Sequence, residues 1–373
     1  YDTSAGAGVP GPETTTRINP TMQFPDNRTA LVTGATGYVA GWIVRRLLEE
    51  GFRVHAAVRD PSNAAKRRSL DALAEELPGT IEYFRADLLE PGSYGDAMRG
   101  CPVVFHTASP FVMTVDDPQR ELVDPARLGT RQVLEQATAT PEVERIVVTS
   151  SCAAIYGDAA DIRQTEDGVF TEAHWNTTSS LRHQPYSHSK VMAEREAWAI
   201  AEAQDRWRLV TVNPSFVLGP AVNPGASGES FAVMAQIMDG TLRAGVPDFR
   251  IGVVDVRDVA EAHLRAAFEP AARGRYLTSG HDSSFPEMAS VLRAHFGDAY
   301  PIPKRTLPKW LVWLAGPLVD KRMTRRAIRR NIGRPWRGDH AKAVRELGMT
   351  WRPLETTLVD MVRQMIDSGR LPA

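Results

Sequence analysis

The amino-acid sequence predicts an α/β protein in which a doubly wound parallel sheet is followed by a smaller C-terminal domain. From residue 28 onward, short β-branched runs alternate with longer stretches of helical composition, which is typical of βαβ units. The chain has 373 residues, of which 43% are hydrophobic. A chain of this size can bury a large core, so its length favours one large domain or two fused ones.

Six strands and five helices are predicted in order over the first part of the chain. The strands are short apolar runs bounded by turn residues, as in a sheet that is buried on both faces. They are Thr29–Thr33, Arg53–Val58, Ile81–Arg85, Val103–His106, Arg145–Thr149 and Leu209–Asn213. The helices between them are Tyr38–Glu50, Ser62–Leu77, Ser93–Arg99, Gln119–Thr138 and Tyr186–Gln204. We therefore expect residues 26–213 to form the sheet domain.

The regular alternation ends after residue 213, where prolines and glycines interrupt the chain. Two strand-like runs, Arg250–Val254 and Arg275–Thr278, follow among short helices. We expect residues 214–373 to form mainly a substrate-binding domain, with a segment near residues 251–285 that returns to the sheet. Residues 1–25 are rich in Thr, Gly and Pro and lack the apolar middle of a secretory signal, so we expect a disordered leader or tag remnant.

The charge balance favours a small-molecule partner. The 44 Lys and Arg residues nearly balance the 45 Asp and Glu residues, which gives a formal net charge of −1. Such a chain has no overall field that would attract nucleic acid or an anionic membrane. The two cysteines, Cys101 and Cys152, lack the spacing of metal ligands, so we expect no metal site. A fold without a disulfide framework suits a reducing cytoplasm.

The run Trp310–Val319 is the part of the sequence that comes closest to a membrane span. Gly316 and Pro317 interrupt it, and it is shorter than the roughly 20 residues that cross a bilayer. We expect a core or lid helix there, and no membrane contact. The basic stretch Lys321–Arg330 spreads its arginines around a short helix, so we expect a solvated face rather than a surface for nucleic acid or acidic lipid.

A glycine-rich loop follows the first predicted strand. Its small residues are Gly34, Gly37, Ala40 and Gly41. Gly34 permits a tight turn, Gly37 lets the backbone approach a pyrophosphate, and the small residue after them lets the helix pack close to the strand. Glycine turns are common at strand ends. The strand before this loop and the helix after it nevertheless favour a Rossmann fold that binds a nicotinamide dinucleotide.

The end of the second predicted strand distinguishes the two nicotinamide cofactors. An acidic residue there bonds the ribose 2′-hydroxyl of NAD(H), whereas an arginine accepts the 2′-phosphate of NADP(H). Arg59 follows the strand, and Lys66 lies a turn into the next helix as a second cation. NADP(H) is therefore the expected cofactor. Asp60 keeps NAD(H) as the minority alternative, and a solvated surface role is the alternative for both cations.

Tyr186 and Lys190 are four residues apart at the start of a predicted helix, so both side chains project from one face. A carbonyl that receives hydride develops negative charge on oxygen, and a phenol donates poorly at neutral pH unless a cation stabilises the phenolate. Lys190 supplies such a cation. The strand ending at Thr149 places the hydroxyls of Ser150 and Ser151 where ligands bind in an open α/β sheet. We expect Ser151 to orient the carbonyl, with Ser150 in reserve; backbone capping is the alternative for both.

Other residues near these motifs are weaker candidates. His106 lies inside an apolar run and is expected to be a satisfied strand-end histidine, while His183 and His188 lack metal-ligand spacing. Trp175 and Asn176 precede the Tyr186 helix, and either a pocket-lining or a packing role is open to them.

The substrate pocket is expected to form from three irregular stretches: Pro110–Asp116, Asp158–Arg182 and Pro220–Phe249. Aromatic and methionine side chains lie in and beside these stretches. They favour an apolar or aromatic carbonyl compound over a phosphorylated one.

Together these motifs resemble the extended short-chain dehydrogenases/reductases, in the branch that holds dihydroflavonol reductase, cinnamoyl-CoA reductase and yeast-type aldehyde or methylglyoxal reductases. The resemblance covers nearly all of the chain from residue 28. Its blocks, in order, are TGATGYVA from Thr33, VRDP from Val58, ADL from Ala86, GCPVVFHTASP from Gly100, YSHSK from Tyr186, NPSFVLGP from Asn213 and VDVRDVAEAH from Val254. Several blocks in the family's order are more specific than any one of them.

The resemblance implies a role for each matching position. It implies Gly34, Thr36, Gly37, Tyr38 and Val39 at the pyrophosphate, Arg59 and Lys66 at the 2′-phosphate, and Asp87 and Leu88 at the adenine. It implies Thr107, Ala108 and Ser109 along the ribose and nicotinamide, Pro214 near the nicotinamide amide, and Tyr186 and Lys190 against the cofactor as well as the substrate. Ser151 matches the branch's catalytic serine. In sugar-epimerase relatives the hydroxyl would align nearer Cys152, which is a weaker donor.

The expected activity is reversible hydride transfer by an NADP(H)-dependent carbonyl reductase, which is an alcohol dehydrogenase in the reverse direction. One alternative is a nucleotide-sugar epimerase or dehydratase with bound NAD; Arg59 and the absence of an acidic pair after Ser151 argue against it. A second alternative is a non-catalytic NADP-sensing protein, which would be expected to lack Tyr186 or Lys190. Members of the family imply a monomer or a homodimer.

Overall fold

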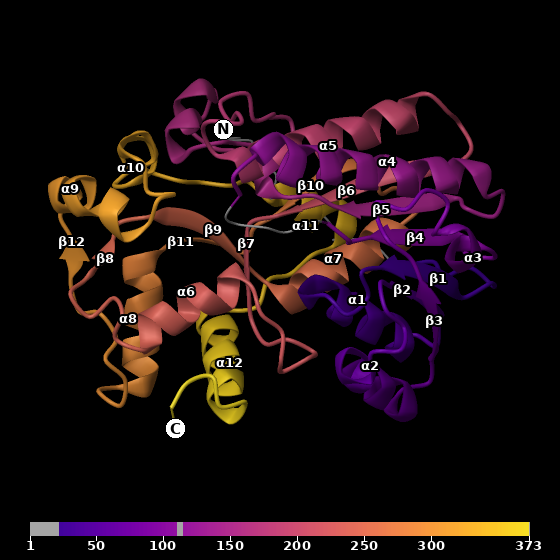
Figure 1. Ribbon diagram of the computed structural model, residues 1–373, viewed down its shortest axis with the longest axis horizontal. Coiled ribbons are helices and arrows are strands. Elements are labelled where there is room, and N and C mark those ends of the chain that lie inside the picture. Colours follow the sequence, from indigo (N-terminus) through magenta and orange to yellow (C-terminus); the bar gives the residue numbers. More distant parts are fainter. Residues whose placement is uncertain (1–21, 110–114, 373) are drawn as a thin grey trace, which may run out of the picture.

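Seven parallel strands form the central sheet of the molecule (Figure 1), whose computed structural model describes residues 22–109 and 115–372. The strands are β1 (Thr29–Thr33), β2 (Arg53–Val58), β3 (Thr80–Arg85), β4 (Val103–His106), β5 (Arg145–Thr149), β6 (Arg208–Pro214) and β10 (Gly274–Thr278). Their order is β10-β6-β5-β4-β1-β2-β3. The chain therefore winds outward in both directions from β1 and β4, as predicted for a doubly wound sheet. Ligands of such sheets bind at this switch point.

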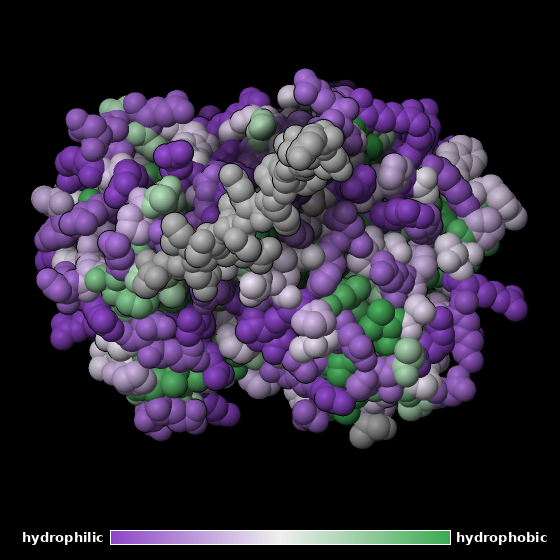
Figure 2. Space-filling model, turned by 180° about the vertical axis from the view of Figure 1, so that it is seen from behind, coloured by the Kyte–Doolittle hydropathy of each residue, from purple (hydrophilic) through white to green (hydrophobic). Residues whose placement is uncertain are grey.

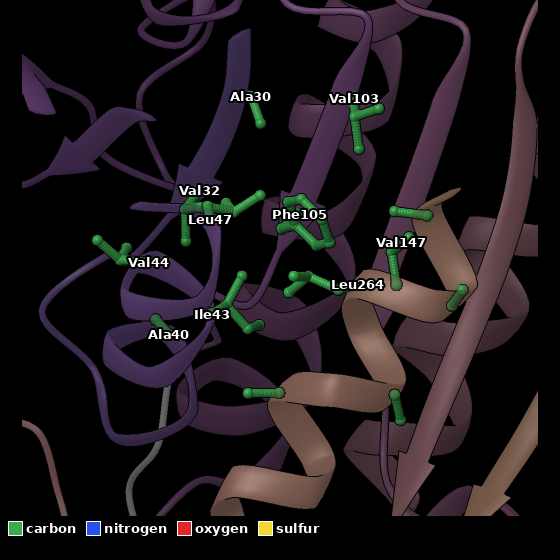
Figure 3. Close-up of a cluster of buried hydrophobic side chains, with 14 of the residues drawn as sticks. Ala30, Val32, Ala40, Ile43, Val44, Leu47, Val103, Phe105, Val147 and Leu264 are labelled. Atoms are coloured by element: carbon green, nitrogen blue, oxygen red, sulfur yellow. The ribbon is translucent and has the colours of Figure 1, made fainter. Parts of the chain in front are cut away.

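Helices cover both faces of the sheet. One face carries α1 (Tyr38–Glu49), α2 (Ala64–Glu76), α7 (Val256–Phe268) and α11 (Ala341–Leu347), and the other carries α3 (Gly95–Met98), α4 (Asp124–Ala139) and α5 (Pro185–Glu202). Figure 3 shows Ile43 and Leu47 of α1 beside Leu264 of α7, all packed on the sheet near Phe105. These side chains have no exposed surface. Apolar residues spaced four apart on α1 thus direct one face of the helix to the sheet.

The seventh strand, β10, matches the strand-like run predicted inside the returning segment, but its position in the sheet was not predicted. β10 pairs in parallel with β6 at the edge, through Gly274 with Val210 and Thr278 with Pro214. The helix before it, α7, packs on the same face as α1. The expected return of the chain near residues 251–285 therefore includes a strand as well as a helix. Local patterning missed this pairing because about sixty residues separate β6 from β10, and no short-range signal specifies such a contact.

A smaller domain with a mixed sheet packs beside the large one. Its strands are β7 (Phe216–Leu218), β9 (Arg250–Asp255) and β11 (His281–Ser284), with a separate pair of β8 (Val246–Pro247) and β12 (Thr306–Leu307). Its helices are α6 (Glu229–Met238), α8 (Phe285–Phe296), α9 (Lys309–Val319), α10 (Arg325–Asn331) and α12 (Leu354–Asp367). Met234, Ile237, Leu292 and Met361 form part of its core. In Figure 1 this domain lies to the left of the large sheet.

Several predicted elements differ from the structure. The helix expected over Ser93–Arg99 shortens to α3, and a π-helical turn, η1 (Gln119–Val123), precedes α4. Two 3₁₀ turns, η2 (Cys152–Ala154) and η3 (Ala159–Gln164), follow β5. Each of these segments is short, so little propensity accumulates to specify it.

The disorder expected over residues 1–25 does not extend to residues 22–25. The backbone N–H of Gln23 donates to Phe268 O at 2.9 Å, and the Phe24 ring packs edge-on against Phe52 and Phe268. Residues 1–21 lie outside the described part of the chain. The Phe24 ring therefore covers the end of the hydrophobic core between α1 and α7.

Two buried histidines connect strands to neighbouring segments in their neutral form. His263 of α7 donates from Nδ1 to Val259 O at 2.7 Å, so its Nε2 accepts from the Thr149 hydroxyl, also at 2.7 Å. His106 Nδ1 lies 3.0 Å from Thr33 Oγ1. The expectation of a satisfied strand-end His106 therefore agrees with the structure. Burial lowers the pKa of His263 to about 4 and that of His106 to about 3.

Acid is expected to destabilise the fold through these two histidines. Their folded pKa values lie below the ordinary 6.5, so below pH 6.5 the unfolded chain takes up protons that the folded chain does not. The stabilisation that the two neutral histidines give the folded state is complete above pH 6.5. It is lost progressively as the pH falls toward their folded pKa values. At pH 5 the loss is roughly 2 kcal/mol of unfolding free energy for each histidine. Urea unfolding at pH 7 and pH 5 measures it.

The His263→Gln variant isolates this effect from the titration of carboxylates. Glutamine keeps one donor and one acceptor but has no proton to take up near pH 6. We expect the variant to lose roughly 2 kcal/mol less than the wild-type chain between pH 7 and pH 5. An unchanged pH dependence would show that His263 is not the titrating group.

Candidate active site

The glycine loop between β1 and α1 turns tightly at two positions that leave no space for a side chain. Gly34 adopts a φ of +62°, and a Cβ there would lie 3.2 Å from Ala108 Cα. A Cβ at Gly37 would lie 3.1 Å from Gly34 O. Gly37 precedes α1, and no side chain caps its first turn. Free N–H groups and positive helix potential therefore face the edge of the sheet, and they suit a phosphate group.

The side chain of Tyr38 points away from the expected pyrophosphate position. Its hydroxyl donates to Gly219 O at 2.5 Å, and its ring packs edge-on against Phe231 of α6. Trp42 likewise donates from Nε1 to Pro220 O at 2.7 Å. The start of α1 therefore holds the loop after β7, and only the backbone of Tyr38 is left to face the glycine loop.

The two small residues after the glycine loop have different neighbours. Ala40 is buried in the core beneath α1, among the side chains that pack on the sheet. Gly41 faces the smaller domain instead, where a Cβ would lie 3.3 Å from Val222 Cβ. The sequence predicts that a small residue, Ala40 or Gly41, lets the helix pack close to the strand, and Ala40 is the one that does so. Gly41 instead allows a contact between the two domains.

Arg59 and Lys66 both lie at the protein surface, after the end of β2. β2 is the neighbour of β1, the strand that leads into the glycine loop. Arg59 directly follows β2, and Lys66 lies in the first turn of α2. Within the described residues, neither side chain has an ion pair or side-chain hydrogen bond. Asp60 is occupied differently, because its Oδ1 accepts from the Ser62 backbone N–H and hydroxyl. Two surface cations therefore lie where a 2′-phosphate was predicted, and the nearby Asp60 carboxylate is already hydrogen-bonded.

The other predicted cofactor positions lie along the carboxyl ends of the strands. Asp87 and Leu88 follow β3, and Asp87 Oδ1 accepts from Leu89 N–H at 2.9 Å. Thr107, Ala108 and Ser109 follow β4, Pro214 ends β6, and Thr36 and Val39 complete the glycine loop and the first turn of α1. The structure thus brings all of them to one edge of the sheet.

Thr33 binds the loop after β4 to β1. Its hydroxyl oxygen accepts the backbone N–H groups of Thr107 and Ala108 at 3.1 and 3.0 Å. With two donors on this oxygen, the hydroxyl hydrogen is directed to His106. These bonds fix the strand ends on both sides of the switch point.

The adjacent serines after β5 have different partners. Ser150 is buried and its hydroxyl donates to Glu194 Oε2. Ser151 Oγ instead accepts from Ala153 N–H at 3.1 Å and is near enough to the Tyr186 phenol to lower its pKa. The geometry therefore favours Ser151 over Ser150 as the hydroxyl that faces the predicted acid.

Tyr186 and Lys190 lie on the first turns of α5, as the spacing predicts. Lys190 Nζ donates to Ser109 Oγ at 2.9 Å and lies 5.6 Å from the centre of the Tyr186 ring. Both residues are half-buried overall, but their polar ends are well desolvated. Burial, assisted by Cys152, raises the pKa of Tyr186, and the Ser151 hydrogen bond opposes that rise. Burial lowers the pKa of Lys190 to about 8.

A buried carboxylate beneath this group was not predicted. Glu194 lies on α5 four residues after Lys190, and only 1% of its surface is exposed. Its oxygens accept from groups just after β5 and on β6, α5 and β10: Ser150, Thr211, Asn213, Trp198 and Arg275. The signal was available in the sequence, because positions 186, 190 and 194 share one helix face. Arg275 is likewise a charged residue inside a strand-like run.

The weaker candidates have structural partners. Arg275 lies 3.9 Å above the Trp175 ring, in a surface hollow of about 570 Å³ that Ser151, Tyr186 and Lys190 do not line. The Asn176 side chain donates to Ala153 O at 2.7 Å. His183 Nε2 lies 2.7 Å from Asp158 Oδ2. Packing is thus the role that the structure favours for Trp175 and Asn176. Residues 110–114 of the expected pocket lie outside the described part.

Comparison with known proteins relates this architecture to a family. Residues 30–277 match the model of the NAD dependent epimerase/dehydratase family. The chain is 38% identical over 267 residues to a cinnamoyl-CoA reductase of Medicago truncatula, covering 70% of this chain and 79% of the relative. It is 33% identical over 285 residues to a dihydroflavonol 4-reductase of Zea mays, covering 74% and 76%.

A solved structure is similar in fold over almost its whole length. Yeast methylglyoxal/isovaleraldehyde reductase Gre2, complexed with NADPH, matches with a TM-score of 0.73 and 25% identity. The match covers 92% of this chain and 100% of that one. Both the large sheet and the smaller domain are therefore shared with a reductase that binds a nicotinamide cofactor.

Proposed function

This chain belongs to the NAD-dependent epimerase/dehydratase family, in the extended short-chain reductase branch with dihydroflavonol and cinnamoyl-CoA reductases, and on that basis we propose that it reduces an aldehyde or ketone with NADPH. The related proteins named above act as reductases of carbonyl or acyl compounds. Membership therefore supports a carbonyl reductase that uses a nicotinamide cofactor. The preference for NADP(H), the residue roles and the substrate class are the finer parts of the proposal.

One observation carries the proposal: the Ser151 hydroxyl is near enough to Tyr186 to lower the pKa of its phenol, and Lys190 Nζ lies 5.6 Å from the centre of the same ring. When bound, the nicotinamide supplies hydride to the carbonyl carbon. Ser151 donates a hydrogen bond to the carbonyl oxygen, and Tyr186 transfers its phenolic proton there as negative charge develops. With a pKa of about 8, Lys190 is mainly protonated at neutral pH. Its positive charge stabilises the phenolate that remains, and its three donors can also hold ribose hydroxyls.

The glycine loop and the surface cations fit an NADP(H) molecule. The turn at Gly34 and Gly37 is too tight for a Cβ at either position, and the uncapped start of α1 suits the pyrophosphate. Arg59 and Lys66 would hold the 2′-phosphate. Thr107, Ala108, Ser109 and Pro214 would line the nicotinamide end of the site, and Asp87 with Leu88 the adenine end.

The direct test mixes purified protein with NADPH and a panel of aromatic and aliphatic aldehydes and ketones. We expect loss of nicotinamide absorbance with apolar or aromatic members of the panel. Nucleotide sugars with NAD form a second arm. Conversion of a sugar without net cofactor consumption would replace the proposal by an epimerase or dehydratase, and tight NADPH binding with no turnover would favour an NADP-sensing protein.

The Arg59→Ala substitution is expected to raise the Kd for NADPH by roughly 10- to 100-fold, because a charged hydrogen bond to phosphate contributes about 1.5–3 kcal/mol. The Kd for NADH should change little, since that cofactor lacks the phosphate. Fluorescence titration with both cofactors measures the two constants. Arg53→Ala, at the opposite end of β2, is the matched control. Equal weakening of NADPH and NADH would contradict the assigned role of Arg59.

A further inference from the structure

The outward face of α9 carries an unusual concentration of exposed apolar side chains. Trp310, Leu318 and Val319 are 68%, 89% and 82% exposed. Within the described chain, five of the eight exposed large hydrophobic residues belong to this one helix, the other two being Trp313 and Leu314. Over most of the face in Figure 2, hydrophilic residues predominate and hydrophobic ones form small separate patches. Of the core or lid helix expected at Trp310–Val319, burial in the core holds only for the side of α9 that carries Val312 and Gly316.

The side of α9 that packs on the protein determines where its exposed apolar side chains point. Val312 is buried, and Gly316 comes so close to α10 that a Cβ would lie 3.0 Å from Ile328 Cδ1. Side chains four apart share one helix face, so Trp310, Leu314 and Leu318 form a stripe directed away from the protein. The exposed stripe is thus held in place by packing on its opposite side.

The chain around this stripe is strongly basic. Residues 304–337 contain eleven Lys and Arg residues and a single acidic one, Asp320, in a protein whose formal net charge is −1. Carboxylates pair with Lys304, Arg322 and Arg330. The other eight basic residues form no salt bridge with a carboxylate among the described residues. The solvated face expected for Lys321–Arg330 is also wrong for Arg330, which bonds Asp158 and Asp161.

The aromatic and basic groups belong to one surface. The Arg325 guanidinium lies 4.6 Å from the centre of the Trp313 ring, so α10 and α9 present their cations and their apolar side chains side by side. Both helices lie at the far end of the smaller domain, away from β2 and β3 (Figure 1). We call residues 304–337 the basic cap.

Against the expectation of no membrane contact for this segment, we propose that the basic cap docks on an anionic lipid surface. A helix with Trp and Leu on one side and Lys and Arg beside it lies in the plane of a membrane interface, with its apolar stripe among the acyl chains and its cations at the headgroups. Tryptophan favours this boundary because its ring is apolar and its N–H is polar. Among the described residues no helix is long and apolar enough to cross a bilayer, so the contact is peripheral.

Charge complementarity selects this occupant over others. A second copy docking through the same face would bring one basic cap against another, and like charges repel. A nucleic acid could use the cations and stack its bases on Trp310 and Trp313, but it would leave the aliphatic side chains of Leu314, Leu318 and Val319 in water. A lipid surface uses both the charge and the aliphatic stripe.

Vesicle flotation of the full chain tests the proposal. We compare vesicles of phosphatidylcholine alone with vesicles that also contain phosphatidylserine, at low and raised salt. Binding to the anionic vesicles is expected to be at least about tenfold tighter and to weaken with salt. Leu314→Gln combined with Leu318→Gln should weaken it about tenfold, and Arg326→Glu combined with Arg329→Glu should remove the preference for anionic lipid.

Matched controls separate the basic cap from general surface effects. Leu128→Gln removes an exposed leucine of α4 and Arg53→Glu reverses an exposed charge of β2; both should bind vesicles as the unaltered chain does. Thermal melting shows that each variant is folded. Absence of flotation with anionic vesicles overturns the proposal, and so does equal binding to neutral ones. Self-association that Leu314→Gln abolishes, without flotation, would assign the face to a second copy instead.

Discussion

The Tyr186→Phe variant is expected to reduce a carbonyl substrate roughly 10²- to 10⁴-fold more slowly than the wild-type enzyme, which is the usual contribution of a positioned general acid. Phenylalanine fills the same space but has no proton to give and cannot bond Ser151. The ring's packing beside Lys190 is kept. The loss should therefore appear in kcat, while the Kd for NADPH stays within a few-fold of wild type.

Single-turnover reduction and fluorescence titration with NADPH measure these two quantities. Tyr94→Phe is the matched control, because Tyr94 is a buried tyrosine whose ring packs in the core on the α4 face. It loses a hydroxyl without touching the site, so its kcat should stay near wild type. If Tyr186→Phe retained most of the wild-type rate, the assignment of Tyr186 as acid would fail.

Much of the large domain could be predicted because its signals are local. Each of the six predicted strands is a continuous apolar run, and the glycine loop and the TyrXxxXxxXxxLys spacing each occupy a few consecutive residues. Ser151 and Lys190 also follow from this reasoning, since parallel strands bring their carboxyl ends to one edge. The family match and the related reductases confirm the fold and the general type of reaction. The individual site residues stay predictions.

The missed features depend on contacts between distant segments. β10 joins the sheet beside β6, and Arg275 on β10 meets Glu194 on α5 across 81 residues of sequence. The Tyr38 side chain turns to Gly219, 181 residues away. No spacing within a short window specifies such pairs. The α9 helix shows the opposite failure, because an apolar run indicates burial but does not say which side of the helix has a partner.

The second large effect is expected from Glu194→Gln, which should lower the free energy of unfolding by about 3–5 kcal/mol. Glu194 and Arg275 form a buried ion pair at 2.6 Å. Removing the negative charge leaves the Arg275 guanidinium buried without its counter-charge, which is the costly way to break such a pair. The glutamine N–H₂ would also face donors, since Ser150 and Asn213 both donate to Glu194 Oε2.

Urea unfolding of Glu194→Gln and Glu196→Gln provides the comparison, because both residues lie on α5 and both pair with an arginine. Glu196 pairs with Arg131, whose side chain is 43% exposed, so its loss should cost at most about 1 kcal/mol. Equal effects of the two variants would contradict a central role for the buried pair. Because Glu194 holds Ser150 and lies on the Lys190 face of α5, its loss should also lower kcat more than it raises the Kd for NADPH.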